Sequence, residues 1–163
     1  MNDRIIIHGI VLSSMPVGEA DRRVVILSGE RGRITAFAKG ARRPGSMFMA
    51  STRPFTYGEF VIYEGRNSNS LDKVDASEYF DDILSDIETS CYGMYFTEFA
   101  DYYAHEGLEA KEAVRVLYSA LLALSKGQMP KSLIKSVYEL RMMMINGEYG
   151  NLPLHDTSDA VKI

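Results

Sequence analysis

The sequence predicts a segregated α+β protein, in which a small β-barrel is followed by an all-α domain. Apolar residues alternate in short runs over residues 1–80, as in half-buried strands. From Asp81 onward they recur at spacings of three and four, as in amphipathic helices. The charge divides at the same place: residues 1–80 hold 11 Lys and Arg against 9 Asp and Glu, and residues 81–163 hold 7 against 13. We therefore expect two domains, residues 1–80 and residues 81–163.

The composition is that of a globular chain with a real core, since 46% of its 163 residues are hydrophobic and 25% are charged. The sequence contains no run of about 18 consecutive apolar residues, which predicts that the chain does not span a membrane. The N-terminal apolar run lacks the small-residue cleavage site of a signal peptide. Cys91 is the only cysteine, so the sequence excludes an internal disulfide and a Cys-based zinc site. These features predict a cytoplasmic protein.

The first three strands are expected at residues 4–13, 22–27 and 33–39, where β-branched and alternating residues dominate. Residues 15–21 form a polar break between the first two strands. Residues 28–32 form a turn with two glycines, so the second and third strands are expected to pair as a hairpin.

Two further strands are expected at residues 54–64 and 71–79, separated by a turn at residues 65–70. Gly58 within the fourth strand indicates a bulge or a sharp bend. Five short strands with glycine bends predict a five-stranded OB-fold β-barrel, which is a common carrier of single-stranded nucleic acid.

Three helices are expected after the barrel. The apolar spacing predicts the first from Asp81 to Gly107, with Cys91 on its apolar side as a core residue. The second covers residues 109–125, and the third begins at Pro130, a residue well suited to a first helical turn.

The stretch between the third and fourth strands carries the main functional signal. Residues 31–53 contain six basic side chains and no acidic one, although the whole chain has a formal net charge of -4. A basic strand that ends in a basic loop with Gly and Pro can follow a phosphate backbone, because each cation displaces a condensed counterion. The alternative is a solvated loop whose charges only keep the protein soluble.

Aromatic residues alternate with the basic positions, and an exposed aromatic ring can stack on a base. The alternative is that Phe55, Tyr57 and Phe60 fill the barrel or the domain interface, and for most of the aromatic residues we favour this interpretation. Phe48, in the loop at residues 40–52, is the ring expected to stack.

The sequence has no catalytic constellation. His8, His105 and His155 share no metal-ligand spacing with one another or with Cys91, and no P-loop is present. We therefore expect that the protein is not an enzyme and that it has no catalytic residue, metal or cofactor. A hydrolase with an unrecognised site is a further alternative.

The helical half suggests a different class of function. It is rich in Met and Tyr, and adaptable Met-lined grooves often take a partner's apolar peptide. The alternative function is therefore a protein-interaction module, with the OB barrel as a scaffold and a partner-binding surface on the helices. Ordinary core packing is the competing interpretation of these residues.

Several motifs resemble the bacterial DNA repair and recombination mediator family RecO. In the first half they are residues 9–12 (GIVL), 18–22 (GEADR), 32–34 (GRI), 38–43 (AKGARR), 54–55 (PF) and 63–66 (YEGR). In the second half they are residues 138–141 (YELR), 147–149 (GEY) and 152–153 (LP). The GEADR and AKGARR motifs together are fairly specific, whereas either alone is weak.

The resemblance implies an N-terminal OB-fold, a helical domain and a non-enzymatic role. Such proteins bind single-stranded and double-stranded DNA and promote strand annealing. They bind the C-terminal tail of single-stranded-DNA-binding protein, and with RecR they load the recombinase at the nucleoid. By position, the resemblance implies that Lys39, Arg42 and Arg43 contact DNA, and that Arg22 supports the basic face or pairs with Asp21. The wider set of cations expected to neutralise phosphates adds Arg33, Arg53 and Arg66.

Two features depart from the family pattern. Many members carry a Cys-rich zinc element soon after the position of residues 152–153, and this sequence has none. The family is also longer. The sequence is therefore expected to be either C-terminally short relative to the family or a zinc-free member, and part of the groove for a partner's tail would then be missing.

Overall fold

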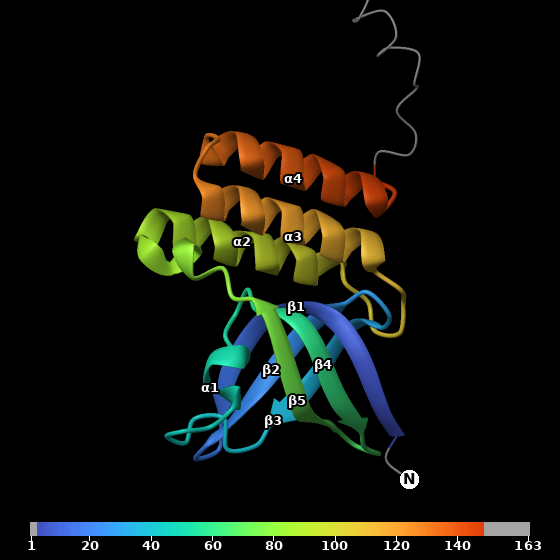
Figure 1. The fold of residues 1–163 in the computed structure, drawn as a ribbon. Coiled ribbons are helices and arrows are strands. Elements are labelled where there is room, and N and C mark those ends of the chain that lie inside the picture. Colours follow the sequence, from blue (N-terminus) through green and yellow to red (C-terminus); the bar gives the residue numbers. More distant parts are fainter. Residues whose placement is uncertain (1–2, 149–163) are drawn as a thin grey trace, which may run out of the picture.

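The computed structural model describes residues 3–148, which form a closed barrel with a layer of helices across one end (Figure 1). The strands are β1 (Asp3–Val17), β2 (Asp21–Ser28), β3 (Gly32–Ala38), β4 (Tyr57–Glu64) and β5 (Asn69–Glu78). The helical segments are α1 (Phe48–Ser51), η1 (Asp81–Ser85), α2 (Ile87–Tyr103), α3 (Lys111–Lys126) and α4 (Lys131–Ile145). The predicted fold class, an OB-fold β-barrel followed by helices, is confirmed.

The barrel closes in the order β1-β2-β3-β5-β4. The expected hairpin of β2 and β3 is present, with Arg23 directly opposite Phe37. A parallel bridge between Phe37 and Ser70 joins β3 to β5. The expected bulge is also present, because the register of β4 against β5 shifts between Tyr57 and Gly58. A Cβ at Gly58 would lie 2.3 Å from the carbonyl oxygen of Asp75, so the close approach of β5 requires glycine there.

Two local predictions in the barrel region are wrong. The polar break expected at residues 15–21 shrinks to residues 18–20, because β1 continues to Val17 and pairs there with Asp21 of β2. The loop expected at residues 40–52 contains the short helix α1, whose Phe48 is buried among the residues that fill the barrel.

The first predicted helix is divided. Residues 81–85 form a 3₁₀ turn, and α2 begins only after Asp86, whose carboxylate accepts a hydrogen bond from the backbone N–H of Thr89 at 2.9 Å. This side-chain cap is a typical helix start. Cys91 is exposed on α2, so its expected place in the core is wrong.

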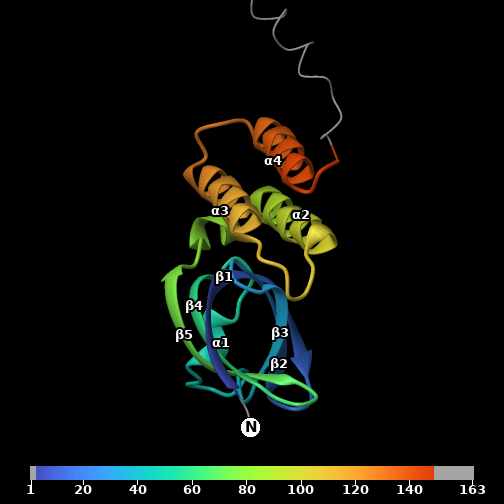
Figure 2. The same ribbon diagram turned by 90° about the vertical axis from the view of Figure 1, so that its right-hand side faces the viewer.

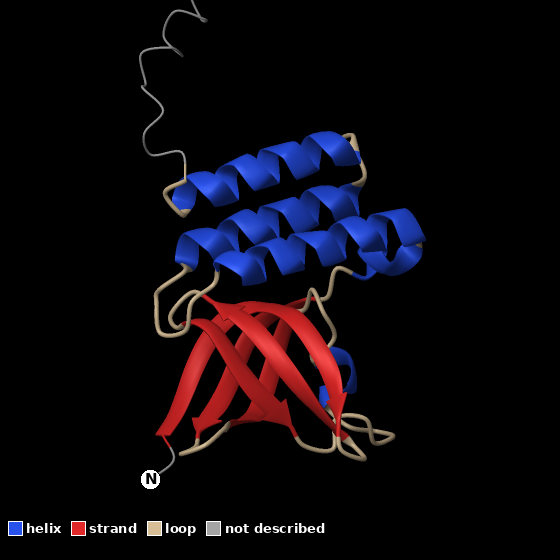
Figure 3. Ribbon diagram, turned by 180° about the vertical axis from the view of Figure 1, so that it is seen from behind, coloured by secondary structure: helices blue, strands red, loops and turns tan. Residues whose placement is uncertain are grey.

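Helices α2 and α3 lie next to the barrel, and α4 packs on them at the side farthest from it (Figures 2 and 3). One apolar core fills the barrel, and a second one joins the barrel to the helices. In the second core, Ile10 and Leu27 on the outside of the barrel pack with Phe96 and Tyr138 of the helices. The hydroxyl of Tyr138 donates a hydrogen bond to the carbonyl oxygen of Phe96 at 2.6 Å, which satisfies the polar end of this buried ring.

Candidate nucleic-acid interface

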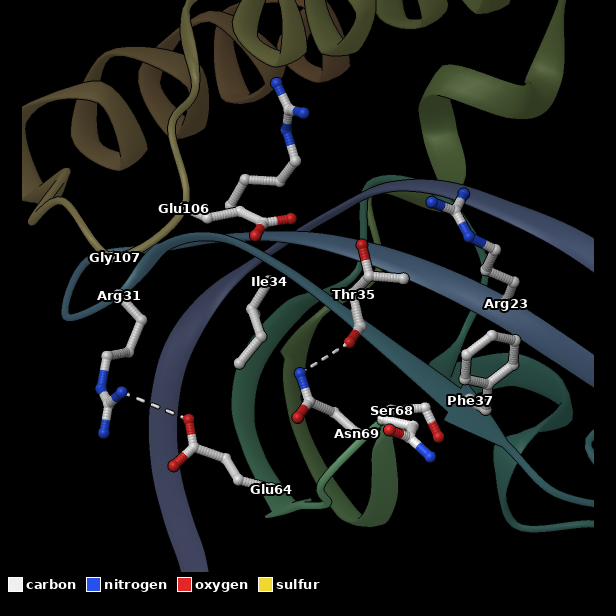
Figure 4. A pocket seen from close by; sticks show the side chains of 12 residues that line it. Arg23, Arg31, Ile34, Thr35, Phe37, Glu64, Ser68, Asn69, Glu106 and Gly107 are labelled. Carbon is white, nitrogen blue, oxygen red and sulfur yellow. Dashed lines mark hydrogen bonds and ion pairs between the residues drawn. The ribbon is translucent and has the colours of Figure 1, made fainter.

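A groove of about 320 Å³ runs over the outer face of β3 (Figure 4). Its floor is formed by alternate residues of β3, and its walls by the turn between β4 and β5 and by the loop between α2 and α3. Its lining residues include Arg23, Arg33, Thr35, Phe37, Asn67, Ser68, Asn69 and Glu106. The outer face of the second and third strands, together with the loop between the fourth and fifth, is the surface with which OB-folds bind oligonucleotides.

The register of β1, β2 and β3 aligns three side chains in a row at the end of the groove that is farther from Glu106. Met15 of β1 lies opposite Arg23 of β2, and Arg23 lies opposite Phe37 of β3. Opposite residues of paired strands point to the same face of a sheet. Arg23 is exposed, and its side chain has no hydrogen bond or ion pair with any residue that the structure describes. An arginine beside a partly exposed aromatic ring can bind a phosphate while the ring stacks on a base.

Arg23 is absent from the residues predicted to contact DNA. The doublet at residues 22–23 places one arginine on each face of β2, and the hairpin register decides which one faces out. Pairing β2 with β3 across the two-glycine turn aligns Arg23 with Phe37, so the sequence did contain a usable signal.

Three of the predicted cations are exposed, and their side chains have no partner within residues 3–148. Lys39 lies two residues after Phe37, in the turn that follows β3. Arg43 lies close to Gly40 in the following loop, since a Cβ on that glycine would be 3.6 Å from its Cδ. Arg66 lies in the turn between β4 and β5, next to Asn67 of the groove wall.

Arg42 and Arg22, which were also predicted to contact DNA, hold loops in place through hydrogen bonds. Arg42 donates from Nη2 to the carbonyl oxygen of Gly18 at 2.6 Å and from Nε to that of Asp21 at 3.2 Å. Arg22 donates to the carbonyl oxygen of Met49 at 2.9 Å and to the hydroxyl of Thr52 at 3.0 Å. Arg22 therefore supports the basic loop from beneath, and the carboxylate of Asp21 instead accepts from the backbone N–H of Gly40.

Arg53 is also engaged, at the start of the helical region. Its guanidinium lies 3.1 Å from a carboxylate oxygen of Asp81, and 5.7 Å from the ring centre of Tyr79. This ion pair and the ring contact hold the segment before β4 against η1, well outside the groove lining.

Arg33 ties β3 to the end of α2. Its Nε lies 3.0 Å from a carboxylate oxygen of Asp101, and Nη2 donates to the carbonyl oxygens of Asp101 at 2.8 Å and Ala104 at 2.7 Å. Nearby, Arg31 pairs with Glu64 at 3.2 Å. The guanidinium charges at the helical end of the groove are thus largely neutralised.

The predicted exposure of Phe48 is wrong. Its ring is 8% exposed and packs inside the barrel, because α1 turns it inward over the core. On the groove itself, Phe37 is the partly exposed ring.

A separate polar cluster lies on the outer face of β1. The two ring nitrogens of His8 lie 2.8 Å from a carboxylate oxygen of Glu30 and 3.3 Å from one of Glu59. The hydrogen bond with Glu30, with the negative charges of both carboxylates, raises the pKa of His8 above its usual value of 6.5. The predicted positions beyond residue 148, among them His155 and residues 152–153, lie outside the described residues.

The chain is similar to a known protein family and to several of its members. A family model described as "Recombination protein O N terminal" matches residues 1–81. The chain is 34% identical over 139 residues to a DNA repair protein RecO of Acetivibrio thermocellus, covering 85% of this chain and 55% of the relative. It is 31% identical over 151 residues to a DNA repair protein RecO of Alkaliphilus metalliredigens, covering 93% of this chain and 60% of the relative. The chain thus spans little more than half the length of these relatives. Among the described residues, no helix has the length and apolar character needed to cross a membrane.

Proposed function

This chain belongs to the RecO family through its N-terminal domain, and we propose that it serves DNA repair and recombination by holding DNA on the outer face of β2 and β3. The observation that carries this proposal is the row of Arg23 and Phe37 beside the groove, continued by Lys39. It places unpaired cations and an aromatic ring on the face with which OB-folds bind oligonucleotides.

The proposed mechanism is electrostatic and needs no catalytic step. Arg23, Lys39, Arg43 and Arg66 neutralise phosphates, while Phe37 stacks on a base. Contacts of this kind discriminate little between sequences, because every base has a flat face and every nucleotide a phosphate. Two strands neutralised on one basic face repel each other less, which favours annealing.

The wider role that the resemblance implies is part of the same proposal. We propose that the protein binds single-stranded and double-stranded DNA and promotes annealing. With RecR and the tail of single-stranded-DNA-binding protein as partners, it would help to load the recombinase. Support for a protein partner comes from the helical half, where exposed Met129, Leu133 and Val137 border a cavity of about 270 Å³ between α3 and α4.

A charge-matched pair of triple variants tests the DNA site. Arg23→Gln/Lys39→Gln/Arg43→Gln removes one cation that lines the groove and two from the segment after β3, and Lys111→Gln/Arg115→Gln/Lys126→Gln removes three from α3. The first should bind a labelled single-stranded oligonucleotide much more weakly in fluorescence anisotropy. The slope of log K against log salt should become shallower by about 2, at roughly 0.7 per lost phosphate contact.

The α3 variant should bind like the wild type, because it carries the same change in net charge at a distance from the groove. Equal losses in the two variants would mean that net charge alone governs binding, and would contradict the proposed site. Retention of a partner peptide by the groove variant would assign DNA and protein binding to different halves of the chain.

A further inference from the structure

The end of the groove nearest the helices is closed by a segment from the helical half. The backbone N–H of Arg33 donates to the carbonyl oxygen of His105 at 3.1 Å, and that of Gly107 donates to the carbonyl oxygen of Arg31 at 2.9 Å. These two bonds flank a β-bridge between Gly32 and Glu106. The loop between α2 and α3 is therefore fixed in register on the first residues of β3.

Gly32 makes this close approach possible. Its φ of 64° lies in the left-handed region, and a Cβ there would be 2.2 Å from the carbonyl oxygen of His105. Only glycine fits this position without moving the loop. The position of Glu106 beside the groove is consequently set by backbone geometry.

Glu106 brings an unpaired negative charge to the groove. It is exposed and lines the cavity, and its carboxylate has no hydrogen bond or ion pair with any residue in the described part of the chain (Figure 4). The neighbouring guanidinium groups do not offset it, because Arg33 is held by Asp101 and Arg31 by Glu64. The free charge at this end is negative, whereas at the opposite end Arg23 and Lys39 leave it positive.

We propose that Glu106 belongs to the nucleic-acid site and that its negative charge ends the path of the bound strand. A phosphate that advanced along β3 toward the helices would meet an unpaired carboxylate. The strand is instead directed from Arg23 across the turn between β4 and β5, where Arg66 is free. This inference rests on the proposed function, and it adds that the helical half limits how far the strand runs along the barrel.

The effect of Glu106 is local. At physiological salt the screening length is about 8 Å, so only phosphates near the closed end of the groove experience this charge. Repulsion between unit charges about 6 Å apart in water changes an equilibrium by roughly threefold. This is the size of effect expected at the groove.

The test is Glu106→Gln, with Glu109→Gln as the matched control. Glu109 lies in the same loop and undergoes the same change of charge, but it lines a different cavity. In fluorescence anisotropy with a labelled oligo(dT) at fixed low salt, Glu106→Gln should tighten binding by about threefold. Glu109→Gln should not change it. Glu106→Asp keeps the charge and should bind like the wild type.

Equal affinities for wild type and Glu106→Gln, or an equal gain in Glu109→Gln, would overturn the inference. If wild-type binding is still weakened by the triple variant at Arg23, Lys39 and Arg43, the proposed function survives that result. Failure of the wild type to bind DNA in a salt-sensitive way would overturn the proposed function and this inference together.

Discussion

Single residues on β3 differ sharply in what the fold leaves them free to do. Arg33 and Phe37 lie four residues apart on the same outer face, yet Arg33 is bound to the end of α2 while Phe37 remains partly exposed beside an unpaired Arg23. Charge alone therefore does not identify a contact residue. What matters is whether the fold has already supplied a partner.

Phe37 is expected to stack on a base. Phe37→Leu keeps an apolar side chain but removes the ring, so single-stranded DNA affinity should fall roughly tenfold, in the range of 1–3 kcal/mol per stacked base. The chain contains no tryptophan, so Phe37→Trp adds a single tryptophan whose fluorescence should be quenched on binding. Wild-type affinity in Phe37→Leu, with no quenching in Phe37→Trp, would rule out stacking at this position.

The sequence shows which residues are basic, but it does not show which of them have a partner in the folded protein. Of the seven cations predicted to contact DNA, Lys39, Arg43 and Arg66 are exposed and have no side-chain partner among the described residues. The sequence did not indicate that carbonyl oxygens of residues distant in sequence, such as Gly18 for Arg42, would occupy other guanidinium groups. The burial of Phe48 is not predictable from the sequence, because a helix of four residues such as α1 is too short to display a helical period.

Among the elements, the strands were the more predictable, because alternation and two-glycine turns are local signals. The hairpin of β2 and β3 and the bulge at Gly58 follow from them. The groove was less predictable, since one of its walls comes from the loop between α2 and α3, more than 60 residues further along the chain. Its contact with β3 depends on tertiary packing that no local pattern encodes.

His8 connects β1 to Glu59 of β4 and to Glu30 in the turn after β2. The contribution of these contacts to the stability of the protein should depend on pH. The folded-state pKa of His8 is raised, so its stabilising contribution is complete below about pH 6.5 and is lost as pH rises through the folded-state value. These side chains are substantially exposed, so the change should be at most about 1 kcal/mol.

Urea unfolding of the wild type and His8→Gln between about pH 5.5 and 8.5 measures this contribution. The difference between their free energies of unfolding should shrink toward high pH. A difference that stayed constant, or grew with pH, would show that the ion pairs of His8 do not stabilise the barrel.

At the scale of the whole molecule, an apolar core joins the two halves, together with polar contacts that include those of the Arg33 side chain. Arg33→Ala removes the contacts to Asp101 and Ala104 and takes the guanidinium donor away from two part-buried carbonyl groups. The free energy of unfolding should fall by about 2 kcal/mol, the usual size for hydrogen bonds to a charged group. Arg43→Ala, which removes an exposed side chain without partners in the described chain, should change it by less than about 0.5 kcal/mol.

Denaturant unfolding followed by circular dichroism compares the two variants. Equal stability of Arg33→Ala and Arg43→Ala would show that Arg33 does not hold the helices to the barrel, and would leave the apolar core as the main connection.

The strand order has a consequence for how the chain folds. β2 and β3 pair across a few residues, but β1 must wait for β4, since Asp3 pairs with Glu64 and Ile10 with Tyr57. Pairing between distant segments carries a larger loop-closure cost and slows folding. During synthesis from the N-terminus, β1 therefore keeps one edge unpaired until the fourth strand has left the ribosome. The barrel closes late, after most of its own sequence is available.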